Sequence, residues 1–519
     1  MLKSSRSEAA GLRTMAWTLP WALGVAAMLP SALPALADTN LFPESEMRDP
    51  ATLEVSVAEP WHVDTVNGTT RQKLVEITVA EDWPTPGESF RVPARLTVPL
   101  DQPAVGLWIT SGYSPQQLEG DSGLSQTQNS LLAQGVGFLE TVVAPLAGYQ
   151  DAGMKDVMRD RFVEELDFRF TRPAIWSMTL MRALTWARSE SGHVDPAGKV
   201  FASGGSKNGL VASVALVNDD RFTGIYASVT PACKTDVREL EPDALAEVEA
   251  ATAAFVTSFE AGDFELGTDR QGLPWRIEKL ESLSHPADET FLPYWDALDA
   301  GHTAEEYRAA RAAVSSAFAP SEHLEALENR GVDMLFEPGT HDYVAFDLLE
   351  CAQVAPSIPI YTRANDGHNT LPHPQAESPS GSPNFEPMIL RHFVTNTPSL
   401  GNPSSTFEIS GHTLTVSVDA GEIEDASGLP SVEGRVFWIY DRAPSGSAGF
   451  LWELIPDDHE ADLAYEEGSD TWQATIALDA EAEHVDFFAN IGFAAGADTI
   501  YRSAPYSRVT LVPEAEALP

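Results

Sequence analysis

A glycine–serine turn between a short apolar strand and a helix constrains this chain more than any other stretch. The run is Lys199-Val-Phe-Ala-Ser-Gly-Gly-Ser-Lys-Asn-Gly209, and residues 210–218, which follow it, favour a helix. Gly204 allows a close backbone approach before the serine, and Gly205 tolerates strain in the turn. Ser206 is then expected at a helix N-terminus, where backbone amides stabilise a developing negative charge. This is the setting of a nucleophilic serine, although an ordinary glycine-rich turn has the same pattern.

The turn departs in one respect from the usual G-x-S-x-G pattern. Position 208 is Asn, and the second glycine follows one residue later, at Gly209. Asn adopts unusual backbone angles more readily than most residues, so a strained turn is still expected here. A reactive serine also needs a base that takes its proton and a third group that orients the base. The rest of the chain has to supply both.

The charge and composition of the chain exclude several classes of partner. Its 519 residues carry a formal net charge of -45, with a pI near 4.4. Such a field repels nucleic-acid phosphates and anionic lipids, so neither is expected as a partner. Hydrophobic residues make up 43%, enough for a sizeable core, and the length indicates two or three domains. The acidity suits a protein that stays soluble in strong salt, or simply an acidic secreted protein.

Residues 1–37 have the pattern of a signal peptide. Three basic residues precede an apolar run at residues 17–33, and Ala35-Leu-Ala37 matches an A-x-A cleavage site. A mature chain that begins at residue 38 is therefore expected in the periplasm or outside the cell. No later run is long and apolar enough to cross a membrane, so membrane insertion is not expected.

Residues 38–398 are expected to form an α/β domain with a mostly parallel sheet. Alternating runs between residues 53 and 100 predict antiparallel strands joined by Pro/Gly turns. From residue 105 to 230 buried strands alternate with helices, which predicts right-handed βαβ units. Helices are expected at residues 125–134, 173–189 and 210–218, and further strands at residues 105–110, 138–143, 199–204, 223–229, 332–336 and 358–362.

Two later segments break this rhythm. Residues 232–330 predict a helical insertion, which at this edge of such a sheet forms a lid or a structural cap. A linker at residues 396–405 leads to a C-terminal domain at residues 399–519, where alternating runs without a convincing helix predict an immunoglobulin-like β-sandwich. The insertion helices are expected at residues 244–259, 275–283 and 304–318, and the sandwich strands at residues 413–418, 434–440, 472–477, 485–489 and 507–512.

The two cysteines, Cys233 and Cys351, both follow the signal peptide. An oxidising compartment allows them to form a disulfide, but the sequence equally allows two buried thiols. The Cys/His spacing of a zinc site is absent from the sequence, and so is the G-x-x-x-x-G-K-[ST] run of a nucleotide site. Neither a metal nor a cofactor is expected.

Two loops that follow predicted strands supply the partners that Ser206 requires. In a hydrolase sheet the acid and then the histidine follow the serine along the chain. Asp342, after the strand at 332–336, is expected to orient the base, and His368, after the strand at 358–362, is expected to be the base. The alternatives in these loops are His341 and His373 as the base, and Glu337, Asp347 and Asp366 as the acid.

The oxyanion of the reaction is expected to bind to backbone amides. One is the amide of Lys207, the residue after the nucleophile, and the other is the amide of Gly112 or Tyr113, in the loop after the strand at 105–110. A side-chain role for Lys207 in recognising substrate charge remains open.

Three short motifs resemble one known family. Gly204-Gly-Ser-Lys-Asn-Gly209 is similar to its G-x-S-K-R-G, Pro338-Gly-Thr-His-Asp342 is close to its G-T-N-D, and Asn365-Asp-Gly-His368 looks like its N-x-x-H. The family is that of the PhoPQ-activated pathogenicity-related proteins, exported bacterial proteins of α/β-hydrolase fold with a β-rich tail. The resemblance implies an exported serine hydrolase. Glucuronoyl esterases, whose turn has the pattern G-x-S-R-x-G, are a second and weaker resemblance.

The sequence thus predicts an exported serine hydrolase that cleaves an ester or peptide bond in a small substrate. Two other classes remain open. One is a peptidase of prolyl-oligopeptidase type, which would need acidic residues in the insertion to hold a substrate amino terminus. The other is a binding or signalling protein on a hydrolase scaffold, for which the intact Ser, His and Asp have no purpose. The acidic residues of the insertion that suit the peptidase are Glu239, Glu241, Glu247 and Glu249.

Overall fold

The computed structural model describes most of the chain between Phe42 and Leu511. The described residues are 42–83, 85–112, 114–121, 123–142, 152–230, 232–233, 242–261, 294–342, 348–367, 382–395, 401–445, 447, 449–450 and 453–511. The predicted signal peptide lies outside them, as do Tyr113 and His368. Among these residues, no helix combines the length and the apolar character needed to cross a membrane.

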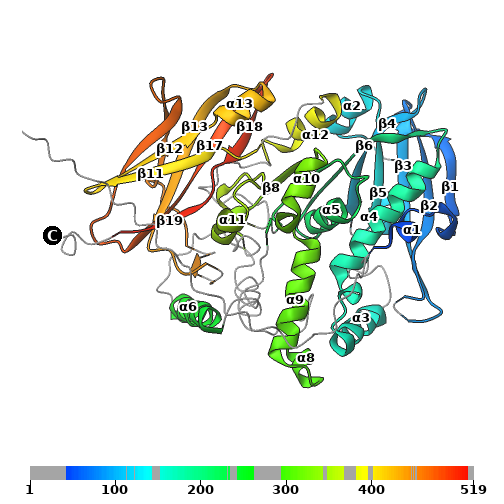
Figure 1. The fold of residues 1–519 in the computed structure, drawn as a ribbon. Coiled ribbons are helices and arrows are strands. Elements are labelled where there is room, and N and C mark those ends of the chain that lie inside the picture. Colours follow the sequence, from blue (N-terminus) through cyan, green and yellow to red (C-terminus); the bar gives the residue numbers. More distant parts are fainter. Residues whose placement is uncertain are drawn as a thin grey trace, which may run out of the picture. The chain divides into compact units, whose positions relative to one another are not determined.

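The α/β part is built on an eight-stranded mixed sheet (Figure 1). Its strand order is β1-β2-β3-β5-β4-β6-β7-β8. Neighbours from β1 to β5 pair antiparallel, whereas those from β5 to β8 are all parallel. The mostly parallel sheet and its antiparallel N-terminal strands are therefore confirmed. The strands are β1 (Ser56–Val63), β2 (Thr70–Glu81), β3 (Ser89–Pro99), β4 (Ala104–Gly112), β5 (Val136–Val142), β6 (Val194–Gly205), β7 (Gly224–Ser228) and β8 (Asp333–Glu337).

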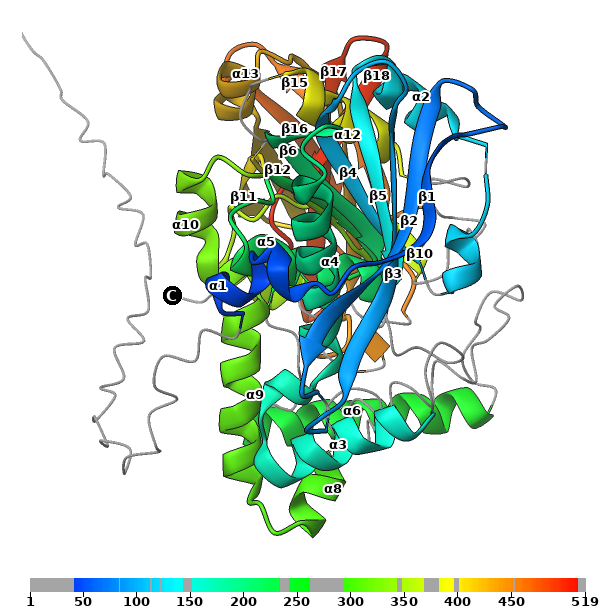
Figure 2. The same cartoon turned by 90° about the vertical axis from the view of Figure 1, so that its right-hand side faces the viewer.

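Two pairs of helices pack on this sheet (Figure 2). The chain moves outward from β4 to β5 through α2 (Gln126–Ala133) and back to β6 through α4 (Arg172–Ser189), so right-handed crossovers put these helices on opposite faces. Helix α5 (Lys207–Asn218) packs beside α4, and α12 (Phe385–Val394) packs beside α2. Side chains such as that of Trp108 are buried under the second pair. The predicted helices of this region are all present.

The segment between β7 and β8 contains helices, as predicted. Helices α6 (Pro242–Ala261) and α9 (Ala304–Phe318) match two of the three expected helices, and the third, at residues 275–283, lies outside the described residues. The short helices α8 (Tyr294–Asp299) and α10 (Leu324–Asn329) were not expected. Helix α9 contacts α5, so part of the insertion packs directly on the helix that follows Ser206.

Helix α3 (Ala152–Glu165), which lies between β5 and α4, also joins the insertion. The sequence did not predict it, because its apolar residues are mixed with charged ones and do not mark one helical face. Its Arg159 Nε lies 3.0 Å from Asp296 Oδ2 in α8. The ring Nε2 of His302 lies 2.8 Å from the carbonyl oxygen of Val163. Polar contacts thus link α3 to the insertion.

The C-terminal domain is a sandwich of two antiparallel sheets. Their strand orders are β11-β12-β16-β15 and β14-β13-β17-β18, with β19 also paired to β17. Side chains from both sheets, such as Val416 and Phe487, share one apolar core. All five predicted strands are present, but β11 begins within the predicted linker and helix α13 (Gly421–Ser427) was not expected. The strands are β11 (Ser404–Ser410), β12 (Thr413–Asp419), β13 (Ser431–Tyr440), β14 (Glu460–Asp462), β15 (Ala464–Glu466), β16 (Thr471–Ala477), β17 (His484–Ala495), β18 (Asp498–Ser503) and β19 (Ser507–Thr510).

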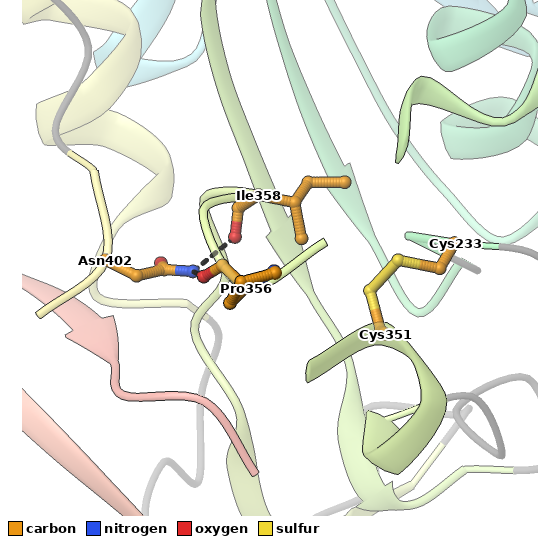
Figure 3. The surroundings of a disulfide bond; sticks show 5 residues. All are labelled: Cys233, Cys351, Pro356, Ile358 and Asn402. Carbon is orange, nitrogen blue, oxygen red and sulfur yellow. Dashed lines mark hydrogen bonds between the residues drawn. A yellow bond between two sulfur atoms is a disulfide. The ribbon is translucent and has the colours of Figure 1, made fainter. Parts of the chain in front are cut away.

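Cys233 and Cys351 are joined by a disulfide (Figure 3). Cys233 lies just after β7, and Cys351 lies in α11 (Leu348–Val354); both are buried. The bond spans a sequence separation of 118 residues and encloses the helical insertion. By restricting the unfolded chain, a disulfide over so long a loop stabilises the fold by about 2–5 kcal/mol. Bonds of this kind persist in oxidising compartments.

Candidate active site

Ser206 lies in the turn between β6 and α5, at the carboxyl edge of the parallel strands. Its backbone has φ 55° and ψ −124°, which residues with a side chain rarely adopt. Its amide donates to the carbonyl of Ser228 in β7 at 2.9 Å, and its carbonyl accepts from the amide of Leu210 in α5 at 3.0 Å. The neighbouring strand and the helix therefore hold the turn from both sides. Strain that is held in this way is typical of functional positions.

The strain is at Ser206 and not, as the sequence suggested, at Gly205 or Asn208. Neither of these two residues has a positive φ, and Asn208 lies inside α5, which begins three residues earlier than predicted. Asn208 is buried, and its Oδ1 accepts a hydrogen bond of 2.9 Å from the hydroxyl of Ser111 at the end of β4. The asparagine thus joins the start of α5 to the strand that leads into the predicted oxyanion loop.

Gly204 and Gly209 let the first turn of α5 lie against the end of β6. A methyl group on Gly204 would meet the Cβ of Asn208 at 2.5 Å and its carbonyl carbon at 2.6 Å. A methyl group on Gly209 would meet the carbonyl oxygen of Gly204 at 3.0 Å. The later position of the second glycine is thus explained, because that residue faces the backbone of the first.

Replacing Gly204 with Ala is expected to damage the turn. The atoms that the new methyl group meets belong mainly to the backbone and Cβ of Asn208, which cannot move without shifting α5. We expect a loss of about 3 kcal/mol in the free energy of unfolding, and a fall of about 10²-fold in the reactivity of Ser206. Denaturant unfolding and the rate of covalent labelling of Ser206 measure the two effects. Gly192→Ala is the control, since the added methyl group meets nothing within 4 Å. Equal behaviour of the two variants would contradict the argument.

Lys207 and Gly112, two of the residues predicted to supply amides to the oxyanion, lie at the ends of α5 and β4. Lys207 is the first residue of α5, and the first amides of a helix are not used by the hydrogen bonds of the helix itself. Gly112 is the last residue of β4, next to Ser111, which is hydrogen-bonded to α5.

Among the described residues, no three His, Cys, Asp or Glu side chains are grouped as metal ligands.

Asp342 directly follows β9 (Gly339–His341), and its side chain is completely buried. Strand β9 pairs in parallel with β10 (Arg363–Gly367), and Gly367 is the register partner of His341. Strands β6, β7 and β8 end at one edge of the large sheet, because their last residues, Gly205, Ser228 and Glu337, are register partners. Because β9 follows β8 after one residue, Asp342 and Ser206 both lie beyond this edge.

Two of the alternative acids form a buried cluster with Arg363. The guanidinium Nη1 lies 3.4 Å from Glu337 Oε1, and Nη2 pairs with Asp366. Burial raises the pKa of the Glu337 carboxyl, and Arg363 partly offsets this rise. The cluster joins the end of β8 to β10 and engages both carboxylates. Asp347 and His373 lie outside the described residues, whereas His341 is buried beside Asp342.

No protein-family model and no curated protein sequence matches the chain. Among solved structures, an acetyl xylan esterase from Paenibacillus sp. R4 is 16% identical over 66% of this chain and 88% of its own, with a TM-score of 0.37. A glucuronoyl esterase from Solibacter usitatus is 13% identical over 62% of this chain and 83% of its own, with a TM-score of 0.33. An acetyl xylan esterase from Thermoanaerobacterium sp. JW/SL YS485 is 13% identical over 62% and 84%, with a TM-score of 0.35.

Likenesses at this level assign no activity to the chain, and membership of the PhoPQ-activated family stays a prediction. The architecture itself agrees with the fold predicted from the sequence. A mostly parallel sheet with helices on both faces presents a serine at a sharp strand-to-helix turn, as α/β-hydrolases do, and a β-sandwich follows. The chain therefore has an α/β-hydrolase architecture with an additional C-terminal β domain.

Proposed function

We propose that the protein is an exported serine hydrolase that cleaves an acyl bond through Ser206, His368 and Asp342. The observation that carries this proposal is the backbone conformation of Ser206 in the turn after β6. Such a conformation costs about 1–3 kcal/mol for a residue with a side chain, and glycine would remove this cost. A serine kept at this position is best explained by chemistry at its hydroxyl group.

The pairing of β9 with β10 supports His368 as the base and Asp342 as its orienting acid. Their preceding residues, Gly367 and His341, are register partners in parallel strands. Consecutive Cα atoms are about 3.8 Å apart, and paired strands are about 4.8 Å apart. The residues that directly precede the proposed base and the proposed acid are therefore paired, and this pairing supports the assignment.

The proposed reaction follows from these assignments. The Ser206 hydroxyl attacks the acyl carbonyl carbon while His368 accepts its proton, and the oxyanion accepts hydrogen bonds from the amide of Lys207 and from that of Gly112 or Tyr113. His368 then protonates the leaving group, which leaves an acyl-enzyme on Ser206. Water, activated by the same histidine, releases the acid. Asp342 holds the imidazole in the tautomer that accepts the serine proton.

The finer parts of the proposal concern location and substrate. The disulfide and the A-x-A site support export. The substrate is proposed to be a small ester or peptide, with a function like that of the PhoPQ-activated proteins. A peptidase of prolyl-oligopeptidase type remains the second candidate. It would use acidic residues of the insertion to hold a substrate amino terminus. Among these, Glu247 has a described side chain, which is exposed on α6. The helical insertion is proposed to act as a lid.

The experiment that tests the proposal is labelling of the mature protein with a fluorophosphonate probe. We expect one adduct per chain, and mass spectrometry of the digested protein should assign it to Ser206. Panels of nitrophenyl esters and of peptide anilides then distinguish esterase from peptidase activity. A folded protein that takes up no probe at low and high salt would contradict the proposal and favour a binding protein. An adduct on another serine would show that the nucleophile is misassigned.

A further inference from the structure

The connection between β13 and β14 in the C-terminal sandwich reaches the strand that leads to Asp342. Arg442, in this connection, is almost fully buried. Its Nη2 donates to the carbonyl oxygen of Thr340 in β9 at 2.7 Å, and its Nε donates to that of Phe450 at 2.7 Å. The guanidinium also lies over the Phe450 ring, 3.8 Å from its centroid. Thr340 is two residues before Asp342, so a charged group of the sandwich fixes the backbone beside the proposed acid.

Other buried groups of the sandwich hold Arg442 in turn. Its Nη1 donates to the hydroxyl of Tyr506 at 2.7 Å, and this hydroxyl donates to Asp486 Oδ2 at 2.8 Å. Arg508 pairs with the same carboxylate, with 2.6 Å between Nε and Oδ1. Asp486 and Tyr506 are both buried. A guanidinium fixed on three sides is a rigid donor, because its planar fork leaves it little freedom to turn.

The same connection also holds the strand that leads to His368. The side-chain amide of Asn365 in β10 pairs with the backbone of Ile455 in both directions. Its Nδ2 donates to the Ile455 carbonyl at 2.8 Å, and its Oδ1 accepts from the Ile455 amide at 2.9 Å. Asn365 has φ 53°, and its own amide donates to Thr340 Oγ1 at 2.8 Å. The residue three positions before His368 is thus tied both to the sandwich and to β9.

Strands β9 and β10 need this support from outside. They form a two-stranded sheet of their own, with a register shift between Arg363 and Gly367. Two short strands are marginally stable by themselves. Hydrogen bonds from the sandwich therefore help to fix β9 and β10. The large sheet itself fixes β6, the strand that leads to Ser206.

We propose that the C-terminal β-sandwich is part of the catalytic centre, because Arg442 and the Asn365–Ile455 pair position the two strands that carry Asp342 and precede His368. The inference rests on the proposed triad. Arg442 and Asn365 are positioning residues, since they act on the acid and the base through the backbone. It follows that the sandwich does more than bind partners or stabilise the chain.

The test compares three variants of the full-length protein. Asn365→Gly removes both bonds to Ile455, while glycine accepts the positive φ. Arg442→Lys keeps the charge but loses the planar fork. The control is Asn402→Ala, which also breaks hydrogen bonds between the C-terminal part and the sheet domain, but at residues that precede β10. These are the bonds to Pro356 (3.1 Å) and Ile358, which Figure 3 shows, and the bond to Ile360 (2.9 Å).

We expect kcat to fall about 10²-fold in Asn365→Gly and about 10-fold in Arg442→Lys, with KM nearly unchanged. The acid limb of the pH profile should move to lower pH, since a histidine less firmly bonded to a carboxylate binds its proton more weakly. Hydrogen exchange at residues 339–342 should accelerate in both variants. Asn402→Ala should keep the wild-type kcat, pH profile and exchange rates at these residues.

Each outcome supports or contradicts the positioning role of Arg442 and Asn365. If the wild type hydrolyses esters and both variants keep its kcat and pH profile, the inference is wrong and the proposed function stands. If the control loses as much activity as Asn365→Gly, the contacts act only through general stability and the inference is again wrong. A wild type whose Ser206 takes up no probe overturns the proposed function and this inference together.

Discussion

Replacing Ser206 with Ala should abolish labelling by the fluorophosphonate and lower kcat by about 10⁴- to 10⁶-fold. The change removes one oxygen atom at a half-buried position, so the fold should be retained. Binding of substrate should persist, because the backbone donors of the oxyanion site are unaffected. The measurements are labelling, single-turnover hydrolysis of a nitrophenyl ester, and thermal unfolding to confirm that the variant is folded.

A matched control is available on β6, the strand that leads to Ser206. Ser203→Ala removes a hydroxyl three residues earlier, where the Oγ atom accepts a hydrogen bond of 2.8 Å from Trp108 Nε1 in the core. We expect this variant to lose about 1 kcal/mol of stability and to keep its labelling. If Ser206→Ala keeps its activity, or if both variants lose it equally, Ser206 is not the nucleophile.

The backbone strain offers an independent check of the same assignment. Ser206→Gly should be as inactive as Ser206→Ala and yet more stable than the wild type, because glycine adopts φ 55° and ψ −124° without steric cost. The gain should be about 1 kcal/mol, reduced by the greater freedom of glycine in the unfolded chain. A stabilised, inactive variant would show that the wild type keeps serine here at the expense of stability.

The turn and the sheet were predictable from sequence because they depend on local patterns. Apolar runs identified the buried strands, and the glycines around Ser206 marked a close approach between β6 and α5 that Gly204 now explains. Helices in which apolar and charged residues are mixed, or which are very short, left no such pattern. For this reason α3 was missed, and α13, with seven residues, was too short to show a helical period.

The contacts that support the site were not predictable, because they join residues far apart in the chain. The bond between Ser111 and Asn208 spans 97 positions, and that between Arg442 and Thr340 spans 102. No periodicity reports such pairs, and Arg442 lies in an irregular connection of the sandwich. The sequence placed Asn365 in a motif that resembles one of a known family, but the reason for an asparagine there became visible only in its pairing with Ile455.

Replacing Asp342 with Asn should lower kcat by about 10⁴-fold near neutral pH. The two side chains have nearly the same shape, and the site is completely buried, so packing should change little. An amide in place of the carboxylate stabilises the wrong tautomer of the imidazole and no longer stabilises its protonated form. Binding contacts with substrate are unaffected, and we therefore expect the loss in kcat and not in KM. Steady-state kinetics on an ester substrate measure both.

Glu337→Gln is the matched control, since Glu337 is an alternative acid in the same region and is equally buried. Glutamine has nearly the same shape as glutamate, so the packing of this buried site should change little. Arg363 keeps Asp366 as a partner, and no buried charge is left alone. We expect kcat within about 10-fold of the wild type, because Glu337 is not expected to contact the base. The reverse result, with Glu337→Gln inactive and Asp342→Asn active, would transfer the role of the acid to the end of β8 and leave β9 with a structural role.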